Sequence, residues 1–195
     1  MVTLETFKHD LEEQRLDDHK YYHQSKWNQL FHLFSAICFL VSEFLIFFNP
    51  VLAAYISWFS MIPRQSGHFF FEPKGFDHIH QMTHEHKEAI KVGYNLFRKR
   101  LLLSSIFVIA PIVAYFYSET AWEFYNNYGY FMLAISAFAY LARIAYLCYD
   151  QSAYVAFVWA SKILTDPIND IKIYWKSPIE LLQGIRYEEG VQIEA

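Results

Sequence analysis

Residues 29–48 read QLFHLFSAICFLVSEFLIFF, a mostly apolar run that carries His32 near its start and Glu43 deep inside. At about 1.5 Å per residue, a helix of this length matches the hydrocarbon core of a bilayer, which is roughly 30 Å thick. Asn49 and Pro50 follow at once, and proline interrupts a helix because it lacks a backbone N–H. We therefore predict a first membrane-spanning helix that ends at this pair.

The overall composition also favours a membrane protein. Of the 195 residues, 54% are hydrophobic, 20% are aromatic and 18% are charged, whereas a typical soluble domain has about 25% charged residues. This composition excludes a disordered chain and a disulfide-stapled secreted fold. The net charge of −4 gives no basic signal, so no nucleic-acid partner is expected. Cys38 and Cys148 lie in apolar runs and are expected to be small buried hydrophobes.

Three further apolar runs complete the expected fold. The run at 51–62 stops at Pro63 and is short for a crossing, so it borrows residues 64–68, crosses a thinned bilayer or is re-entrant. The runs at 101–117 and 128–149 are longer. The expected fold class is all-α, a polytopic membrane helical bundle with about four membrane helices in two hairpins. A soluble helical bundle with buried apolar helices is the alternative.

The predicted organisation is a single integral-membrane domain over residues 1–195. Its last part contains Thr165-Asp166-Pro167, which resembles a helix start, and the stretch SPIE at 177–180, which resembles a capping box. The expected segments are a cytoplasmic N-terminal segment (1–28), a first hairpin (29–66), a histidine-rich cytoplasmic segment (67–100), a second hairpin (101–149) and interfacial C-terminal helices (150–195).

The distribution of basic residues predicts the orientation. Eleven of the sixteen Lys and Arg residues precede residue 101, and the hairpin tips at 49–50 and 118–127 carry none. Because cytoplasmic loops of membrane proteins are enriched in Lys and Arg, both termini and residues 63–100 are expected to be cytoplasmic. The expected location is a bacterial inner membrane or an endoplasmic reticulum membrane.

All nine histidines precede residue 87. The predicted topology brings His23, His32, His68 and the 78–86 cluster to one membrane face, and imidazole is a ligand for first-row transition metals. His23 and His32 are nine residues apart and would point in opposite directions on one straight helix, so one shared ion requires a break near residues 24–26. His80 and His84 share a helical face and are expected to complete a mononuclear or dinuclear site. His9 and His19 are expected to be ordinary polar residues, and His78 and His86 to be solvated or to support the ligands.

Two charged residues lie inside the predicted spans. Glu43 is costly in lipid, so we expect it to face the bundle and to be protonated or paired. Arg143 either extends to the membrane surface or holds the carboxylate of an acyl substrate.

Two short motifs carry a family resemblance. Residues 22–32 have the form YHxxxxNxxxH immediately before a predicted span, and residues 67–72 have the form GHxxFE immediately after the first hairpin. Both are similar to the signatures of the membrane 2-hydroxy fatty acid dioxygenase family, which is described as iron(II)-dependent. The resemblance implies O2-dependent shortening of a 2-hydroxy fatty acid by one carbon. It nominates His23, His32 and His68 as metal-associated catalytic residues and Asn28 and Glu72 as groups that support them.

The resulting expectation is a non-haem oxygenase with Fe(2+), a fatty acyl substrate and O2, embedded in membrane lipids, with an oligomer left open. A di-iron fatty acid hydroxylase or desaturase is one alternative, although the chain has no adjacent His-His pair. A non-catalytic structural subunit of a membrane complex is the other.

Overall fold

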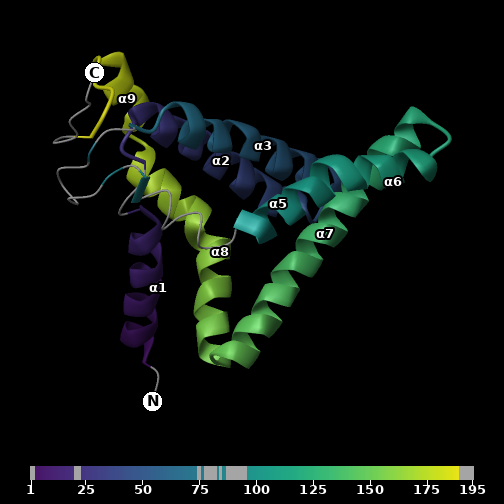
Figure 1. Ribbon diagram of the computed structural model, residues 1–195, viewed down its shortest axis with the longest axis horizontal. Helices are drawn as coiled ribbons and strands as arrows, with labels where there is room; N and C mark the ends of the chain where they lie inside the picture. The colour runs from purple at the N-terminus through teal and green to yellow at the C-terminus, as the bar shows by residue number, and fades with distance from the viewer. Residues whose placement is uncertain are drawn as a thin grey trace.

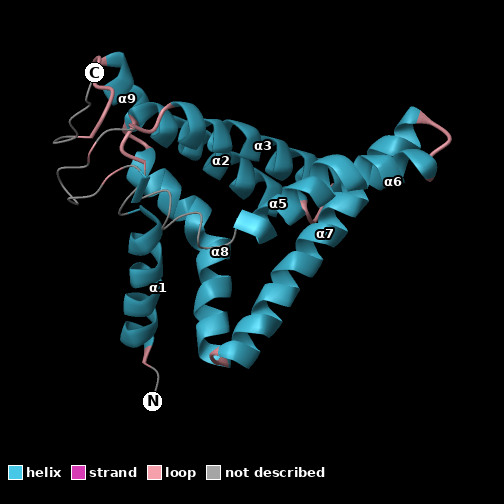
Figure 2. Ribbon diagram, viewed as in Figure 1, coloured by secondary structure: helices cyan, strands magenta, loops and turns pink. Residues whose placement is uncertain are grey.

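The computed structural model describes residues 3–19, 23–73, 76, 83, 85–86 and 96–188 and has an all-helical fold (Figure 1). Over these residues the chain forms no strand (Figure 2), and its one isolated antiparallel bridge joins Ser25 and Tyr187. The predicted all-α class is confirmed. The helices are α1 (Leu4–His19), α2 (Lys26–Leu45), α3 (Pro50–Phe70), α5 (Leu96–Ser104), the π-helical turn η1 (Ser105–Ile109), α6 (Ala110–Phe116), α7 (Ala121–Asp150), α8 (Ala153–Tyr174) and α9 (Ser177–Leu182).

The helices α2 and α3 lie side by side as an antiparallel pair (Figure 1). The break predicted at residues 49–50 is confirmed, because Asn49 caps α3 by accepting a hydrogen bond from the Leu52 N–H at 3.1 Å. The predicted stop at Pro63 is wrong, since α3 continues through this residue to Phe70. Pro63 has no backbone N–H, so the helix lacks the hydrogen bond from this position to the Phe59 carbonyl. The packing of α3 along α2 outweighs the loss of this one hydrogen bond. Of the three alternatives for the second run, the one that extends it through residues 64–68 agrees with the structure.

The helices α5, η1 and α6 follow one another without interruption and run antiparallel to α7 (Figure 1). The wide π-helical turn η1 ends at Ile109, two residues before Pro111. A proline ring presses on the carbonyl four residues earlier, which is that of Phe107, and a π-helical turn gives the ring room. The helical segment therefore continues past Pro111 to Phe116.

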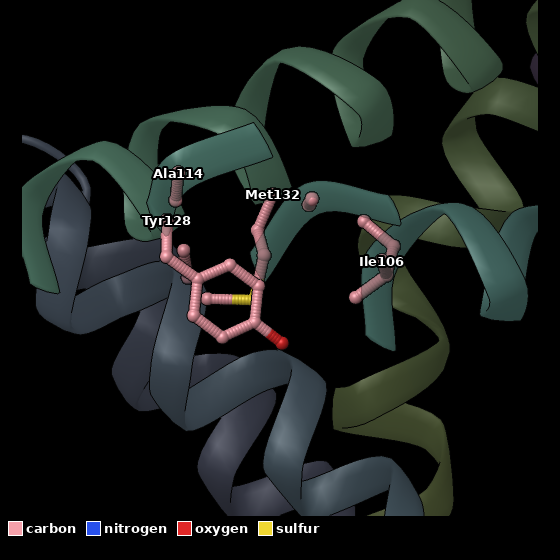
Figure 3. Packing of buried hydrophobic residues seen from close by; sticks show 6 residues of the cluster. Ile106, Ala114, Tyr128 and Met132 are labelled. Carbon is pink, nitrogen blue, oxygen red and sulfur yellow. The ribbon is translucent and has the colours of Figure 1, made fainter. Parts of the chain in front are cut away.

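The core lies where α3, η1, α6 and α7 meet (Figure 3). Three alanines allow the helix backbones to approach closely, as small residues do between membrane helices. Ile106 and Met132 fill the space between them and are fully buried. The cluster consists of Ala54, Ile106, Ala110, Ala114, Tyr128 and Met132.

The helix α8 returns from the end of α7 to the α2–α3 pair, so that α7 and α8 form a V (Figure 1). The helix start predicted at residues 165–167 is wrong, because α8 begins at Ala153, where Ser152 accepts a hydrogen bond from the Val155 N–H at 3.2 Å. Thr165 instead donates to the Ser161 carbonyl of the same helix at 2.6 Å. The predicted capping role of Ser177 is also wrong, since its hydroxyl donates to Gln29 Oε1 at 2.7 Å.

Within the part of the chain that the structure describes, two helices, α2 and α7, are long and apolar enough to cross a membrane, and Arg100–Phe116 forms a shorter apolar helix. On α2 an apolar stripe of Phe34, Ile37, Val41 and Phe44 is exposed, an arrangement that is rare on soluble monomers. Two of the four predicted spans therefore lie in helices with the length and apolar character that a crossing requires. The two-hairpin topology and its orientation stay predictions.

Three residues in or near these helices differ from expectation. Glu43 was expected to face the bundle but is exposed on α2, because α3 and α8 cover other sides of that helix. Cys148 was expected to be buried and is exposed, and Cys38 is half-buried; both are free thiols.

Candidate metal centre

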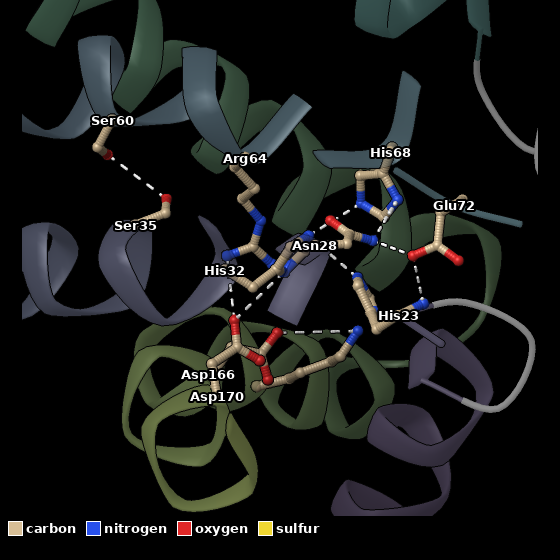
Figure 4. A network of polar contacts seen from close by, with 11 residues as sticks. His23, Asn28, His32, Ser35, Ser60, Arg64, His68, Glu72, Asp166 and Asp170 are labelled. Carbon is tan, nitrogen blue, oxygen red and sulfur yellow. Dashed lines mark hydrogen bonds and ion pairs between the residues drawn. The ribbon is translucent and has the colours of Figure 1, made fainter. Parts of the chain in front are cut away.

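The structure brings three of the predicted ligands together. His23 precedes α2, His32 lies in the second turn of α2, and His68 lies in the last turn of α3 (Figure 4). The Nε2 atom of His32 is 3.0 Å from Nε2 of His23 and 3.0 Å from Nε2 of His68. The His23 and His32 side chains are buried and His68 is half-buried, and one ligand atom from each lies within 4.8 Å of the others.

This geometry fits a shared cation. An imidazole nitrogen carries either one N–H or one lone pair in the ring plane, so it makes one good hydrogen bond. His32 Nε2 has two nitrogen neighbours at 3.0 Å, which is one more than such hydrogen bonding explains. Metal–nitrogen bonds of about 2.1 Å that meet at a right angle would place their nitrogens about 3.0 Å apart. The residues therefore fit a first-row transition metal bound by three imidazoles.

His23 reaches the cluster because the chain turns sharply before α2. Its φ is +67°, in the left-handed region that non-glycine residues rarely adopt. Two side chains hold this turn, since Glu72 Oε1 accepts from the His23 N–H at 2.9 Å and Gln29 donates to the His23 carbonyl at 2.7 Å. The helix break predicted near residues 24–26 is confirmed, as α1 ends at His19 and α2 begins at Lys26.

Asn28 and Glu72 lie beside the histidines, as the motif resemblance implied. The amide nitrogen of Asn28 donates to Glu72 Oε1 and lies 3.4 Å from His68 Nδ1. Glu72 Oε2 also accepts from the Gln24 N–H at 3.4 Å. The Glu72 carboxylate therefore supports the backbone at His23 and Gln24 and binds the Asn28 amide.

Gly67 explains how α3 approaches α2 closely enough for His68 to join the cluster. A Cβ at this position would overlap the Asn28 Oδ1 atom and would lie 3.2 Å from the Asn28 Cα. The glycine of the GHxxFE motif is thus a packing requirement between the two helices.

Three residues of the site were not predicted from the sequence. Asp170 and Tyr174 come from α8, and Arg64 comes from α3, one turn before His68. Asp170 Oδ2 accepts from Arg64 Nη1 at 3.0 Å and lies 3.9 Å from His32 Nδ1 (Figure 4). The Tyr174 ring packs against His23 and His32, with centroid separations of 5.7 and 6.1 Å. Burial raises the pKa of the Tyr174 phenol, which keeps it neutral.

Two acidic residues near the C-terminus contact the first residue of α2. Lys26 Nζ is buried and pairs with Glu180 at 2.8 Å and with Glu188 at 2.6 Å. Burial tends to raise the pKa of Glu188, but hydrogen bonds from Lys26 and Gln29 outweigh it and lower the pKa below its usual range. These contacts hold Gln29, and through it the His23 turn.

The remaining predicted site residues lie elsewhere. His78, His80 and His84 fall outside the described residues, and nothing here tests their part in the site. The structure does not bring Arg143 to the cluster: its guanidinium lies 5.3 Å from the centroid of the Tyr146 ring on its own helix. His9 and His86 are exposed.

The fold and this cluster together define an all-helical protein with a largely buried three-histidine centre. Comparison with protein families, with curated proteins and with solved structures finds no match to this chain.

Proposed function

We propose that the chain is an iron-dependent membrane oxygenase in which His23, His32 and His68 hold Fe(2+). The observation that carries this proposal is the convergence of their three Nε2 atoms, two of them 3.0 Å from the third. The two motifs that surround these histidines resemble those of the 2-hydroxy fatty acid dioxygenases, and α2 and α7 are apolar enough to lie in the lipid from which such a substrate would come.

The proposed reaction converts a 2-hydroxy fatty acid and O2 into the acid one carbon shorter. It balances with carbon dioxide and water as the other products, so it needs no external reductant. When bound, iron would supply the redox chemistry at the coordination positions that three imidazoles leave open.

The protein's own residues would hold the three histidine ligands in place and exclude water from one side of the centre. Glu72 and Gln29 fix the His23 backbone, Asn28 lies against His68, and Tyr174 covers two of the rings. The burial of His23 and His32 keeps water away from one side of the centre. Arg143 as the carboxylate-binding residue stays a prediction from the sequence.

Product analysis tests the assignment. Detergent-purified protein loaded with Fe(2+) is incubated with a 2-hydroxy fatty acid and O2, without reductant, and the products are separated by mass. We expect the acid one carbon shorter from wild-type protein and from His86→Ala, which changes an exposed histidine, and none from His68→Ala. A hydroxylated or desaturated product that forms only with added reductant would contradict the dioxygenase and favour the hydroxylase or desaturase alternative.

A further inference from the structure

The two nitrogens of the His32 ring have different neighbours: Asp170 lies beside Nδ1, whereas His23 and His68 lie beside Nε2. The Asp170 Oδ2 atom is 3.9 Å from His32 Nδ1, whereas His32 Nε2 is the atom 3.0 Å from both His23 and His68 (Figure 4). Asp170 lies 138 positions after His32 in the chain and reaches it because α8 packs against α2.

Arg64 holds this carboxylate in place. Its Nη1 donates to the same Oδ2 atom at 3.0 Å, and the Asp170 side chain is 2% exposed. A carboxylate buried without a cation is strongly disfavoured, and the Arg64 guanidinium supplies that cation to Asp170. The pair also ties α3 to α8 directly beside His32 of α2.

The charge on Asp170 bears on which nitrogen of His32 carries the proton. A carboxylate beside Nδ1 favours the tautomer with its N–H on Nδ1, which leaves the lone pair on Nε2. Nε2 is the nitrogen that faces the other two imidazoles, and a metal binds a lone pair and not an N–H.

We propose that Asp170, held by Arg64, is a positioning residue that fixes the tautomer and ring orientation of His32 for metal binding. This inference rests on the proposed metal centre and assigns a role to a residue outside both sequence motifs. Such a carboxylate behind a metal-binding histidine raises metal affinity because it prepares the ligand before the ion arrives.

The test measures the affinity of full-length, detergent-purified protein for Co2+, in competition with a chromophoric chelator. Asp170→Asn keeps the side-chain shape, removes the charge and is expected to weaken binding about 10- to 100-fold. Asp166→Asn is the matched control, since Asp166 lies one turn earlier on α8 and faces Arg15 at 3.5 Å and Lys162 at 3.9 Å. It is expected to bind as wild type does. Equal affinity of Asp170→Asn and wild type would overturn the proposal.

A double variant separates positioning from folding. Arg64→Gln combined with Asp170→Asn removes both charges, so neither is left buried alone. If the pair serves only to join α3 to α8, the double variant regains wild-type affinity, which would overturn the proposal. The positioning role predicts that the Co2+ affinity of the double variant stays low. It also predicts that the visible absorption bands of bound Co2+ change in both Asp170 variants but not in Asp166→Asn.

Failure of wild type and Asp166→Asn to bind Co2+ at all would overturn the metal centre itself, and the positioning role with it.

Discussion

The Nε2 atoms of His32 and His68 lie 3.0 Å apart although 36 residues separate them in the chain. The α2–α3 hairpin creates this proximity, because it returns the end of α3 to the beginning of α2. The site therefore depends on the contact between these helices as well as on the histidines themselves.

Gly67→Ala is expected to weaken the site without touching a ligand. The added methyl would overlap Asn28 and push α3 away from α2, at a cost of about 1–3 kcal/mol. Thermal unfolding and Co2+ affinity should both fall, whereas Ser66→Ala, next in the chain, should change little because its hydroxyl donates to the Ile62 carbonyl of its own helix. Wild-type affinity in Gly67→Ala would show that His68 does not depend on this close approach.

Two isoleucines in η1 provide a matched test of the core. Ile106 is fully buried, whereas Ile109 is 51% exposed. Ile106→Ala should destabilise the protein by about 2–5 kcal/mol, because it leaves a cavity among packed helices. Ile109→Ala removes the same atoms from the surface and should lower the unfolding temperature far less. Similar effects of the two changes would contradict this core.

The Lys26–Glu188 contact predicts a dependence of stability on pH. The folded pKa of Glu188 is lowered, so the contact contributes stability above the usual pKa of 4.5 and loses it as pH falls through the lowered value. Wild type should therefore unfold at a higher temperature than Glu188→Gln at pH 7, and the difference should vanish in acid. A difference that stays constant down to pH 3, well below the usual pKa of 4.5, would show that it has another cause.

Sequence patterns predicted the features that depend on neighbouring residues. The apolar run at 29–48 and the break at Asn49-Pro50 correspond to α2 and its end, and the two motifs contain all three clustered histidines. The stop predicted at Pro63 and the helix start predicted at residues 165–167 are both wrong, since α3 continues through Pro63 and α8 continues through Pro167. Packing against neighbouring helices outweighs the one backbone hydrogen bond that each proline removes. A proline in the sequence does not indicate which neighbouring helices the segment packs against.

The contribution of α8 to the site was beyond sequence reasoning for a different reason. Asp170 and Tyr174 meet the histidines only after the chain has passed through α7 and turned back. Their spacing of four residues places them on one helical face, and that face also carries Asp166. This polar stripe can be recognised in the sequence, but its pattern does not indicate that His32 is the residue it contacts.

Elemental analysis of detergent-purified protein, prepared without chelators, tests the central claim most directly. Wild type and His86→Ala should each contain about one iron per chain, or two if a second ion binds, and His68→Ala should lose it, because two imidazoles hold a metal much less well than three. Circular dichroism of the three proteins controls for folding. Folded wild-type protein that contains no metal, even after incubation with Fe(2+), or a metal content that His68→Ala leaves unchanged, would contradict a centre formed by His23, His32 and His68.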